Sequence, residues 1–153
     1  MINNNRDFDA AKKIEQDVSY CISSYFNLTA INMRDEYSPF DFIFSEQINN
    51  LQVVAAIVEF RHRPTTSIGR YDALTISKIK IDKLIKWGNY MKIPPVLIVL
   101  WKDTGLMWCK LREGYNVVEQ TRKTKERESD RAEQLYEIPV VKFKLLMEYT
   151  APK

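Results

Sequence analysis

The run from Leu51 to Arg61 most constrains the fold of this chain, because it is dense in valine, isoleucine and alanine. A nearly continuous apolar run of this length is typical of a central strand that is buried on both faces of a sheet. Glu59 follows six apolar residues and stands two positions before Arg61. A buried carboxylate needs a partner. We therefore interpret Glu59 either as a metal ligand or as the ion-pair partner of Arg61 or Arg63.

A second acid, Asp41, opens another predicted strand over Phe40–Ser45, directly after a turn that ends in Pro39. Two carboxylates on neighbouring strands can share one edge of a sheet and hold a hard divalent cation such as Mg²⁺ or Mn²⁺. A cation held in this way can activate water against a phosphodiester. The alternative for Asp41 is an acid at a strand start that accepts hydrogen bonds from backbone amides.

The remaining periodicities predict two helices and further strands. We expect helices over 8–26 and from Ser77, as the N-cap, to about 91. The expected strands cover 28–34, 40–45, 51–61, 96–101, 106–111 and 138–143. The order helix, three strands, helix, strand predicts an α/β fold. Its mixed central β-sheet would combine an antiparallel meander with a right-handed crossover, and a helix would flank each side.

The C-terminal part gives weaker local signals. Residues 119–134 are very polar and predict a mobile surface segment, and the basic stretch 122–131 is either a solvated loop or a flap over nucleic acid. Pro139 predicts an edge position for its strand. Residues 144–149 predict a short closing helix.

Length and composition indicate one soluble domain. The chain has 153 residues, of which 45% are hydrophobic and 28% charged, as in ordinary globular proteins. We expect a single domain over 1–153, with a core at about 8–101 and a C-terminal extension at about 102–153. No apolar run is long enough for a membrane span, and the N-terminus has no apolar signal segment. With Cys21 and Cys109 interpreted as buried thiols, we expect a cytoplasmic protein without membrane contact.

The element order, with acids in these places, resembles the PD-(D/E)XK nuclease superfamily and its restriction-endonuclease-like fold. Pro39-Phe40-Asp41 matches the first half of the motif, and Glu59-Phe60-Arg61 matches the second. Arginine stands at Arg61 where the family usually has lysine. Over most of the chain the sequence is also similar to small phage-encoded members. That similarity lies in the segments 73–80, 86–87, 96–101 and 130–143.

The resemblance implies an αβββαβ core with C-terminal additions and the metal-dependent hydrolysis of DNA. Asp41 and Glu59 would bind Mg²⁺ (or Mn²⁺). Glu15 would complete the site from the first helix, as a glutamate does in junction resolvases, although Asp17 is also available. DNA, in branched or double-stranded form, would be the partner, and a homodimer is one option for the assembly.

Arg61 leaves two alternatives open, because arginine stays protonated and cannot be a general base at neutral pH. Either Lys80 of the following helix supplies the missing cation, or the site is catalytically impaired and the domain binds only nucleic acid or protein. We further expect Arg63, Arg70, Lys78 and Lys83 to contact phosphates near the site. We expect the three tryptophans, Trp87, Trp101 and Trp108, to be core or subunit-contact residues rather than platforms for bases.

Overall fold

The computed structural model describes residues 2–33, 38–122 and 131–151. Two α-helices, one 3-10 helix and nine strands follow one another along this part of the chain. In order they are α1 (Ile2–Phe26), β1 (Thr29–Asn32), β2 (Phe42–Ile48), β3 (Leu51–Arg63), β4 (Ala73–Ser77), α2 (Lys78–Met91), β5 (Pro95–Trp101), β6 (Leu106–Lys110), β7 (Asn116–Arg122), β8 (Arg131–Pro139), the 3-10 turn Val140–Lys142 and β9 (Lys144–Met147).

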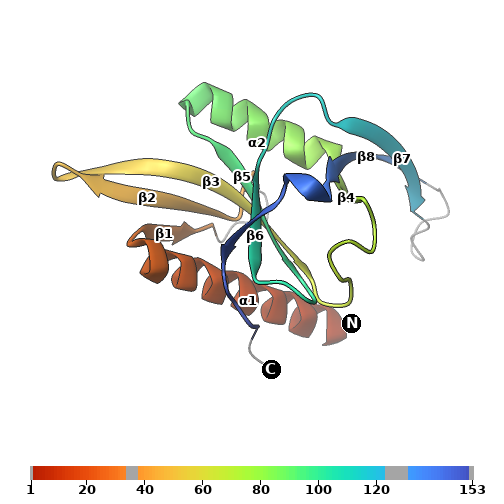
Figure 1. Ribbon diagram of the computed structural model, residues 1–153, viewed down its shortest axis with the longest axis horizontal. Coiled ribbons are helices and arrows are strands. Elements are labelled where there is room, and N and C mark those ends of the chain that lie inside the picture. Colours follow the sequence, from red (N-terminus) through yellow and green to blue (C-terminus); the bar gives the residue numbers. More distant parts are fainter. Residues whose placement is uncertain (1, 34–37, 123–130, 152–153) are drawn as a thin grey trace.

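A six-stranded mixed sheet forms the centre, in the order β1-β2-β3-β5-β6-β9. Strands β1 to β3 form an antiparallel meander, and β3 pairs in parallel with β5 after the crossover through α2. Helix α1 lies on one side of this sheet and α2 on the other (Figure 1). The predicted α/β class, the meander and the parallel crossover are therefore confirmed.

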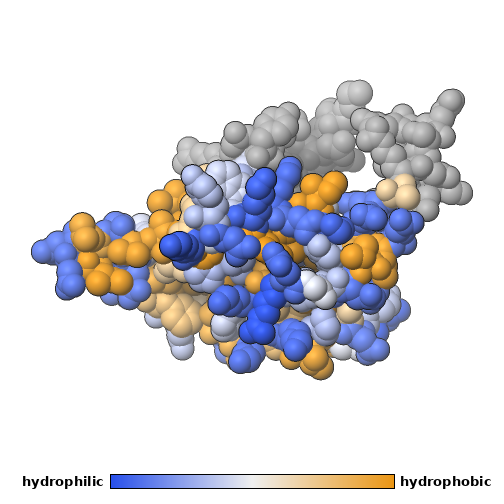
Figure 2. All heavy atoms as spheres, turned by 90° about the horizontal axis from the view of Figure 1, so that it is seen from above, coloured by the Kyte–Doolittle hydropathy of each residue, from blue (hydrophilic) through white to orange (hydrophobic). Residues whose placement is uncertain are grey.

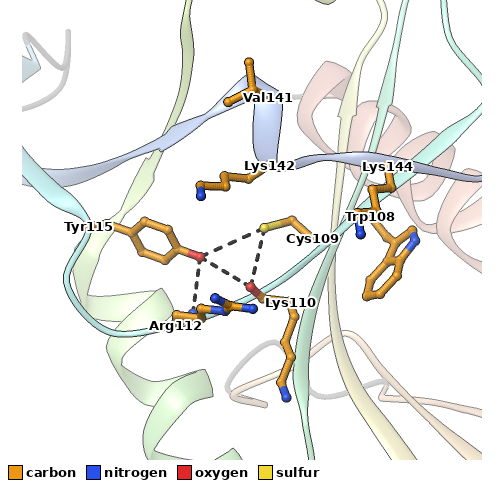
Figure 3. A pocket seen from close by; sticks show the side chains of 8 residues that line it. All are labelled: Trp108, Cys109, Lys110, Arg112, Tyr115, Val141, Lys142 and Lys144. Carbon is orange, nitrogen blue, oxygen red and sulfur yellow. Dashed lines mark hydrogen bonds between the residues drawn. The ribbon is translucent and has the colours of Figure 1, made fainter.

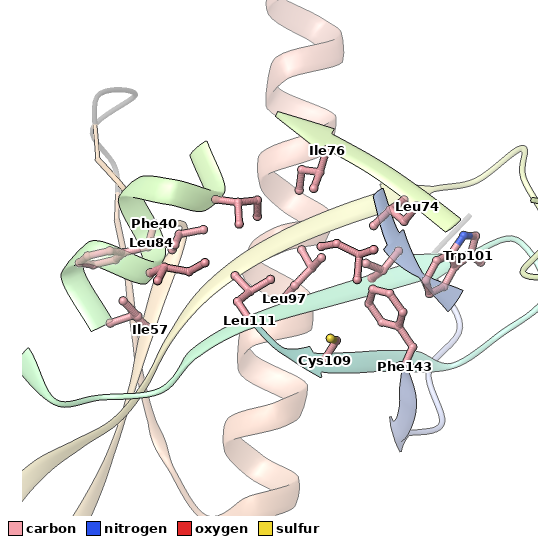
Figure 4. Close-up of a cluster of buried hydrophobic side chains, with 14 residues drawn as sticks. Phe40, Ile57, Leu74, Ile76, Leu84, Leu97, Trp101, Cys109, Leu111 and Phe143 are labelled. Carbon is pink, nitrogen blue, oxygen red and sulfur yellow. The ribbon is translucent and has the colours of Figure 1, made fainter. Parts of the chain in front are cut away.

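Alternate residues of the central strands point to opposite faces and build two hydrophobic clusters. Ile57 and Leu97 belong to the cluster under α2 (Figure 4), together with Leu84 of that helix. Val58 and Ile98 belong to the other cluster, on the side of α1. Both faces of the sheet are thus covered where β3 and β5 pair.

A separate three-stranded sheet, in the order β4-β8-β7, packs beside α2. The prediction of a mobile segment over 119–134 is wrong for its ends, because 119–122 belong to β7 and 131–134 to β8. These polar residues pair backbone to backbone, from Glu119 opposite Gln134 to Arg122 opposite Arg131. Such pairing requires no apolar side chains, so composition alone does not reveal it. The proposed flap lies mostly at 123–130, outside the described residues.

Three other local predictions are corrected. Residues 144–147 form strand β9 rather than a helix, because they pair with the edge of β6. Strand β8 is the middle strand of its sheet, so the edge position predicted from Pro139 is wrong. Pro139 is tolerated there because it is the last residue of the strand. Ser77 does precede α2 as predicted, but its side chain makes no capping hydrogen bond.

The described helices include none that is long and apolar enough to cross a membrane. Cys21 and Cys109 are both free thiols, and Cys109 is buried whereas Cys21 is only partly buried. Trp101 is buried and packs edge-on against Phe143. Trp87 is 43% exposed and therefore not a core residue, whereas its expected alternative, a subunit contact, stays a prediction.

Candidate metal site

The candidate site lies where β3 extends beyond β2. Phe42, the first residue of β2, pairs with Val58, so among the described strands β5 is the only paired neighbour of residues 59–63 of β3. Asp41 occupies the position just before β2. Its backbone N–H donates to the carbonyl of Val58 at 2.9 Å, and its Oδ2 accepts the backbone N–H of Phe60 at 2.8 Å. These two bonds hold the Asp41 carboxylate beside Glu59.

Glu59 is fully buried and lies under two cations. Its Oε1 is 2.8 Å from Lys80 Nζ and 3.1 Å from Arg61 Nη2. Both contacts are within ion-pair distance but lack the alignment of a hydrogen bond, and Oε2 has no hydrogen-bond partner in the described part of the chain. Burial, and then the negative charge of Asp41, raise the pKa of Glu59 to about 7, against the opposing effect of Arg61 and Lys80. The desolvation of this carboxylate therefore outweighs its two ion pairs.

Glu15 of α1 approaches the same group of charges. It is buried, and its Oε2 forms an ion pair with Lys12 Nζ at 3.1 Å. Burial and the nearby charge of Asp41 raise the pKa of Glu15, whereas Lys12 and Lys80 lower it. Asp17, the other acid considered on this helix, instead accepts a short hydrogen bond from the hydroxyl of Tyr149. Of these two acids, Glu15 is the one coupled to Asp41 and Lys80.

The donor set fits a hard divalent cation held by two carboxylates. Within 2–33, 38–122 and 131–151, no three histidine, cysteine, aspartate or glutamate side chains lie close enough to form a metal-binding group. Mg²⁺, however, is commonly bound through one or two carboxylates, with waters and substrate phosphates completing its shell. Glu59 Oε2, which is buried and finds no partner within the described ranges, is a ligand atom that a cation would satisfy. Glu15 stands near this pair without joining it in a group of three.

Two of the predicted cations, Lys80 and Arg61, reach the site, as described above. Lys78 does not, because its Nζ donates to Asp82 Oδ2 at 2.7 Å. The other oxygen of this carboxylate, Asp82 Oδ1, accepts the hydroxyl of Tyr136 at 2.5 Å. The spacing of Lys78 and Asp82 could have suggested their pairing, but nothing local links them to Tyr136 on a distant strand.

A cavity of about 400 Å³ lies elsewhere, at the end of β6 (Figure 3). Cys109, Tyr115 and Lys142 are among the residues that line it, and none of the predicted site residues does. The hydroxyl of Tyr115 is already engaged there, since it accepts the backbone N–H of Arg112 at 3.2 Å. We therefore place the candidate site at Asp41 and Glu59 rather than in this cavity.

Comparisons with known proteins found a solved structure with a similar fold and a family whose model matches the sequence. One solved structure with a similar fold is Hjc, a Holliday junction resolvase from the archaeal hyperthermophile Archaeoglobus fulgidus. The two share 10% sequence identity with a TM-score of 0.53, over 84% of this chain and 82% of that one. At this identity the likeness shows the restriction-endonuclease-like fold, which confirms the predicted fold. A search of curated proteins found no match.

The sequence also matches a family model over residues 4–146, which is nearly the whole chain. The family is described as "Phage putative PDDEXK endonuclease", and PD-(D/E)XK nucleases generally depend on a divalent metal. The resemblance read from the two acidic motifs is thereby confirmed. This chain belongs to that phage family of PD-(D/E)XK endonucleases.

Proposed function

We propose that this protein is a DNA endonuclease that depends on Mg²⁺ or Mn²⁺, with Asp41 and Glu59 as the metal ligands. The observation that carries the proposal is the Glu59 carboxylate, which is fully buried beside Asp41 and has one oxygen without a partner among the residues that the structure describes. Burial raises its pKa to about 7 despite Arg61 and Lys80, so a further cation would favour the charged form of this carboxylate near neutral pH. When bound, a divalent ion would lower the pKa of its water and neutralise charge on the phosphate.

Lys80 is the side chain best placed for the role that lysine has in this family. It comes from the first turn of α2, yet its Nζ lies 2.8 Å from Glu59 Oε1. From there the ammonium group can donate hydrogen bonds to a scissile phosphate or to the attacking water. The guanidinium of Arg61 lies 3.1 Å from the same oxygen, and its planar fork suits it to binding a phosphate rather than to proton transfer.

Glu15 would support this arrangement from α1. Its charge is coupled to that of Asp41 and Lys80. In the proposal Glu15 would help to hold the metal from α1, while Lys12 neutralises part of its charge. This role predicts a smaller loss for Glu15→Gln than for a change at Asp41 or Glu59.

Cleavage assays test the proposal directly. Purified protein is incubated with supercoiled, linear and four-way-junction DNA in Mg²⁺, Mn²⁺ or EDTA. We expect cleavage of at least one substrate with metal, none in EDTA, and loss of cleavage in Asp41→Ala and Glu59→Ala. Glu46→Ala, which removes an exposed acid of β2, is the matched control and should remain active. Cleavage that persists unchanged in the first two variants would sink the site assignment.

A second candidate function is nucleic-acid or protein binding without cleavage, and the position of Arg61 favours it. The guanidinium lies 3.1 Å from Glu59 Oε1 and carries a permanent charge that competes with a cation. Calorimetric titration with Mn²⁺ separates the two functions. No binding heat, together with retained DNA binding, would favour the non-cleaving alternative.

A further inference from the structure

Helix α2 has two different flanks beside its buried face. The buried residues are Ile81, Leu84, Ile85 and Gly88. On one flank, Lys78 Nζ donates to Asp82 Oδ2, and Asp82 Oδ1 accepts the hydroxyl of Tyr136 on β8. The other flank begins with Lys80, which reaches Glu59, and continues at helical spacing through Lys83, Trp87 and Tyr90. We call these last three residues the α2 stripe.

The α2 stripe exposes aromatic surface beside positive charge. Trp87 is 43% exposed and Tyr90 is 82% exposed. Their rings contact edge to face, with centroids 6.3 Å apart. Lys83 and the neighbouring Lys86 are exposed, and neither forms an ion pair with any described residue. The stripe contains no acid, so it presents aromatic rings and cations together.

We propose that the α2 stripe binds an unpaired, single-stranded segment of DNA next to the phosphate that is held at Lys80. This inference rests on the proposed function for the identity of the ligand. With a rise of 1.5 Å per residue, Lys83 lies about 4.5 Å, Trp87 about 10.5 Å and Tyr90 about 15 Å from Lys80 along the helix axis. A strand that leaves the site along α2 meets a cation first and two aromatic rings next.

Unpaired DNA fits this surface better than a duplex or a second copy of the chain. Aromatic side chains stack on bases whose faces are free, and stacking on every base type makes such binding tolerant of sequence. Bases inside a duplex offer no free face. A two-fold dimer through the stripe would bring the lysines of both copies, Lys83 and Lys86, into one interface without an acid of the stripe to neutralise them. Figure 2 views the molecule from above, the side on which α2 lies in Figure 1, and shows a largely hydrophilic surface there.

Fluorescence anisotropy in EDTA tests the inference without cleavage. The probes are 5′-fluorescein-labelled (dT)15 and a 15-base-pair duplex with the same label. We expect Trp87→Ala and Tyr90→Ala each to raise the Kd for (dT)15 about tenfold, with less than about a twofold change for the duplex. Lys83→Ala should weaken both probes and reduce the salt dependence of (dT)15 binding by about 0.7 in log–log slope. Tyr20→Ala, which removes an exposed tyrosine of α1, is the matched control and should change neither Kd.

Each possible result either supports or overturns the inference that the α2 stripe binds single-stranded DNA. An unchanged Kd of (dT)15 in both aromatic variants, or an equal loss for the duplex, overturns it. Sedimentation that shows a dimer dissociated by Trp87→Ala, with DNA binding intact, assigns the stripe to a second copy and also overturns it. Far-UV circular dichroism confirms that the variants are folded. A protein that never cleaves DNA, yet binds (dT)15 through Trp87, loses the proposed function and keeps this inference.

Discussion

The two halves of strand β3 differ in how far their side chains are exposed to solvent. The first half, 51–56, pairs with β2 alone and projects from the body as a hairpin (Figure 1), so Leu51 is 68% exposed and Val53 is 44% exposed. The second half, 57–63, pairs with β5 and contains Glu59, which is fully buried. Apolar side chains thus face water in one half, while a carboxylate is shielded from it in the other. Such a local reversal is expected at a functional site, where stability is given up for chemistry.

The largest predicted effect tests whether the buried half is a catalytic centre. We expect Lys80→Ala to lower the single-turnover cleavage rate about 100-fold or more, because one positioned charge at a phosphate contributes on that scale. Lys102→Ala, in the exposed turn between β5 and β6, should leave the rate unchanged. Arg61→Ala should lower the cleavage rate less than Lys80→Ala does. A larger loss of rate in Arg61→Ala than in Lys80→Ala would assign the catalytic cation to Arg61.

The next prediction concerns the pH dependence of stability that Glu59 contributes. Its pKa rises from 4.5 in the unfolded chain to about 7 in the folded protein, so the folded state favours the protonated form. The resulting stabilisation is fully present below pH 4.5 and is lost as pH rises through about 7. One pKa unit corresponds to about 1.4 kcal/mol, so the loss amounts to roughly 3 kcal/mol at alkaline pH.

Urea unfolding at pH 5 and pH 8 measures this contribution. Glu59→Gln lacks the titration, so its free energy of unfolding should fall less between the two pH values than that of the wild type. Titrating groups that do not interact with Glu59 are common to both proteins and cancel in the difference. Mn²⁺ should restore the wild type at pH 8 by binding the folded carboxylate, and should leave Glu59→Gln nearly unchanged. Parallel pH curves for the two proteins would show that Lys80 and Arg61 already compensate the charge.

The contrast within β3 also shows what the sequence alone can reveal. The apolar run predicted a strand, and the strand forms, but burial on both faces holds only for its second half. The second half is buried because β5 pairs with it and α1 and α2 cover the sheet. The sequence of residues 51–56 gives no sign that these elements do not extend over the first half. Similarly, β9 forms because the edge of β6 is available, a tertiary effect that overrides the local pattern.

The candidate site could likewise be predicted from the sequence only in part. Asp41 and Glu59 were identifiable because acids next to apolar strand residues are costly unless they have a function or a partner. The approach of Lys80 depends on the direct passage of β4 into α2, and β4 itself was not predicted. The hydrogen bond from Tyr136 to Asp82 joins residues that are 54 positions apart in the sequence. Distances of this kind follow from the assembled fold and not from local spacing.

A moderate effect is expected where α2 is tied to the smaller sheet. Tyr136→Phe removes the hydroxyl that donates to Asp82 at 2.5 Å. A hydrogen bond to a charged acceptor contributes about 1.5–3 kcal/mol, and the partial exposure of Asp82 reduces this to about 1 kcal/mol. Tyr90→Phe removes a hydroxyl on the same helix that is exposed to solvent, so it should not measurably change the free energy of unfolding. Equal effects of the two variants would show that the tie does not hold α2.

The last prediction compares two valines of the same strand. Val58 is 1% exposed and Val53 is 44% exposed. Val58→Ala should lower the free energy of unfolding by about 2 kcal/mol, through lost burial and a cavity, whereas Val53→Ala should change it by less than about 0.5 kcal/mol. Both substitutions sacrifice the same strand preference of valine, so the difference between them reports burial alone. If Val53→Ala costs as much as Val58→Ala, the hairpin must be covered in solution, and a dependence of that cost on protein concentration would identify the cover as a second copy of the chain.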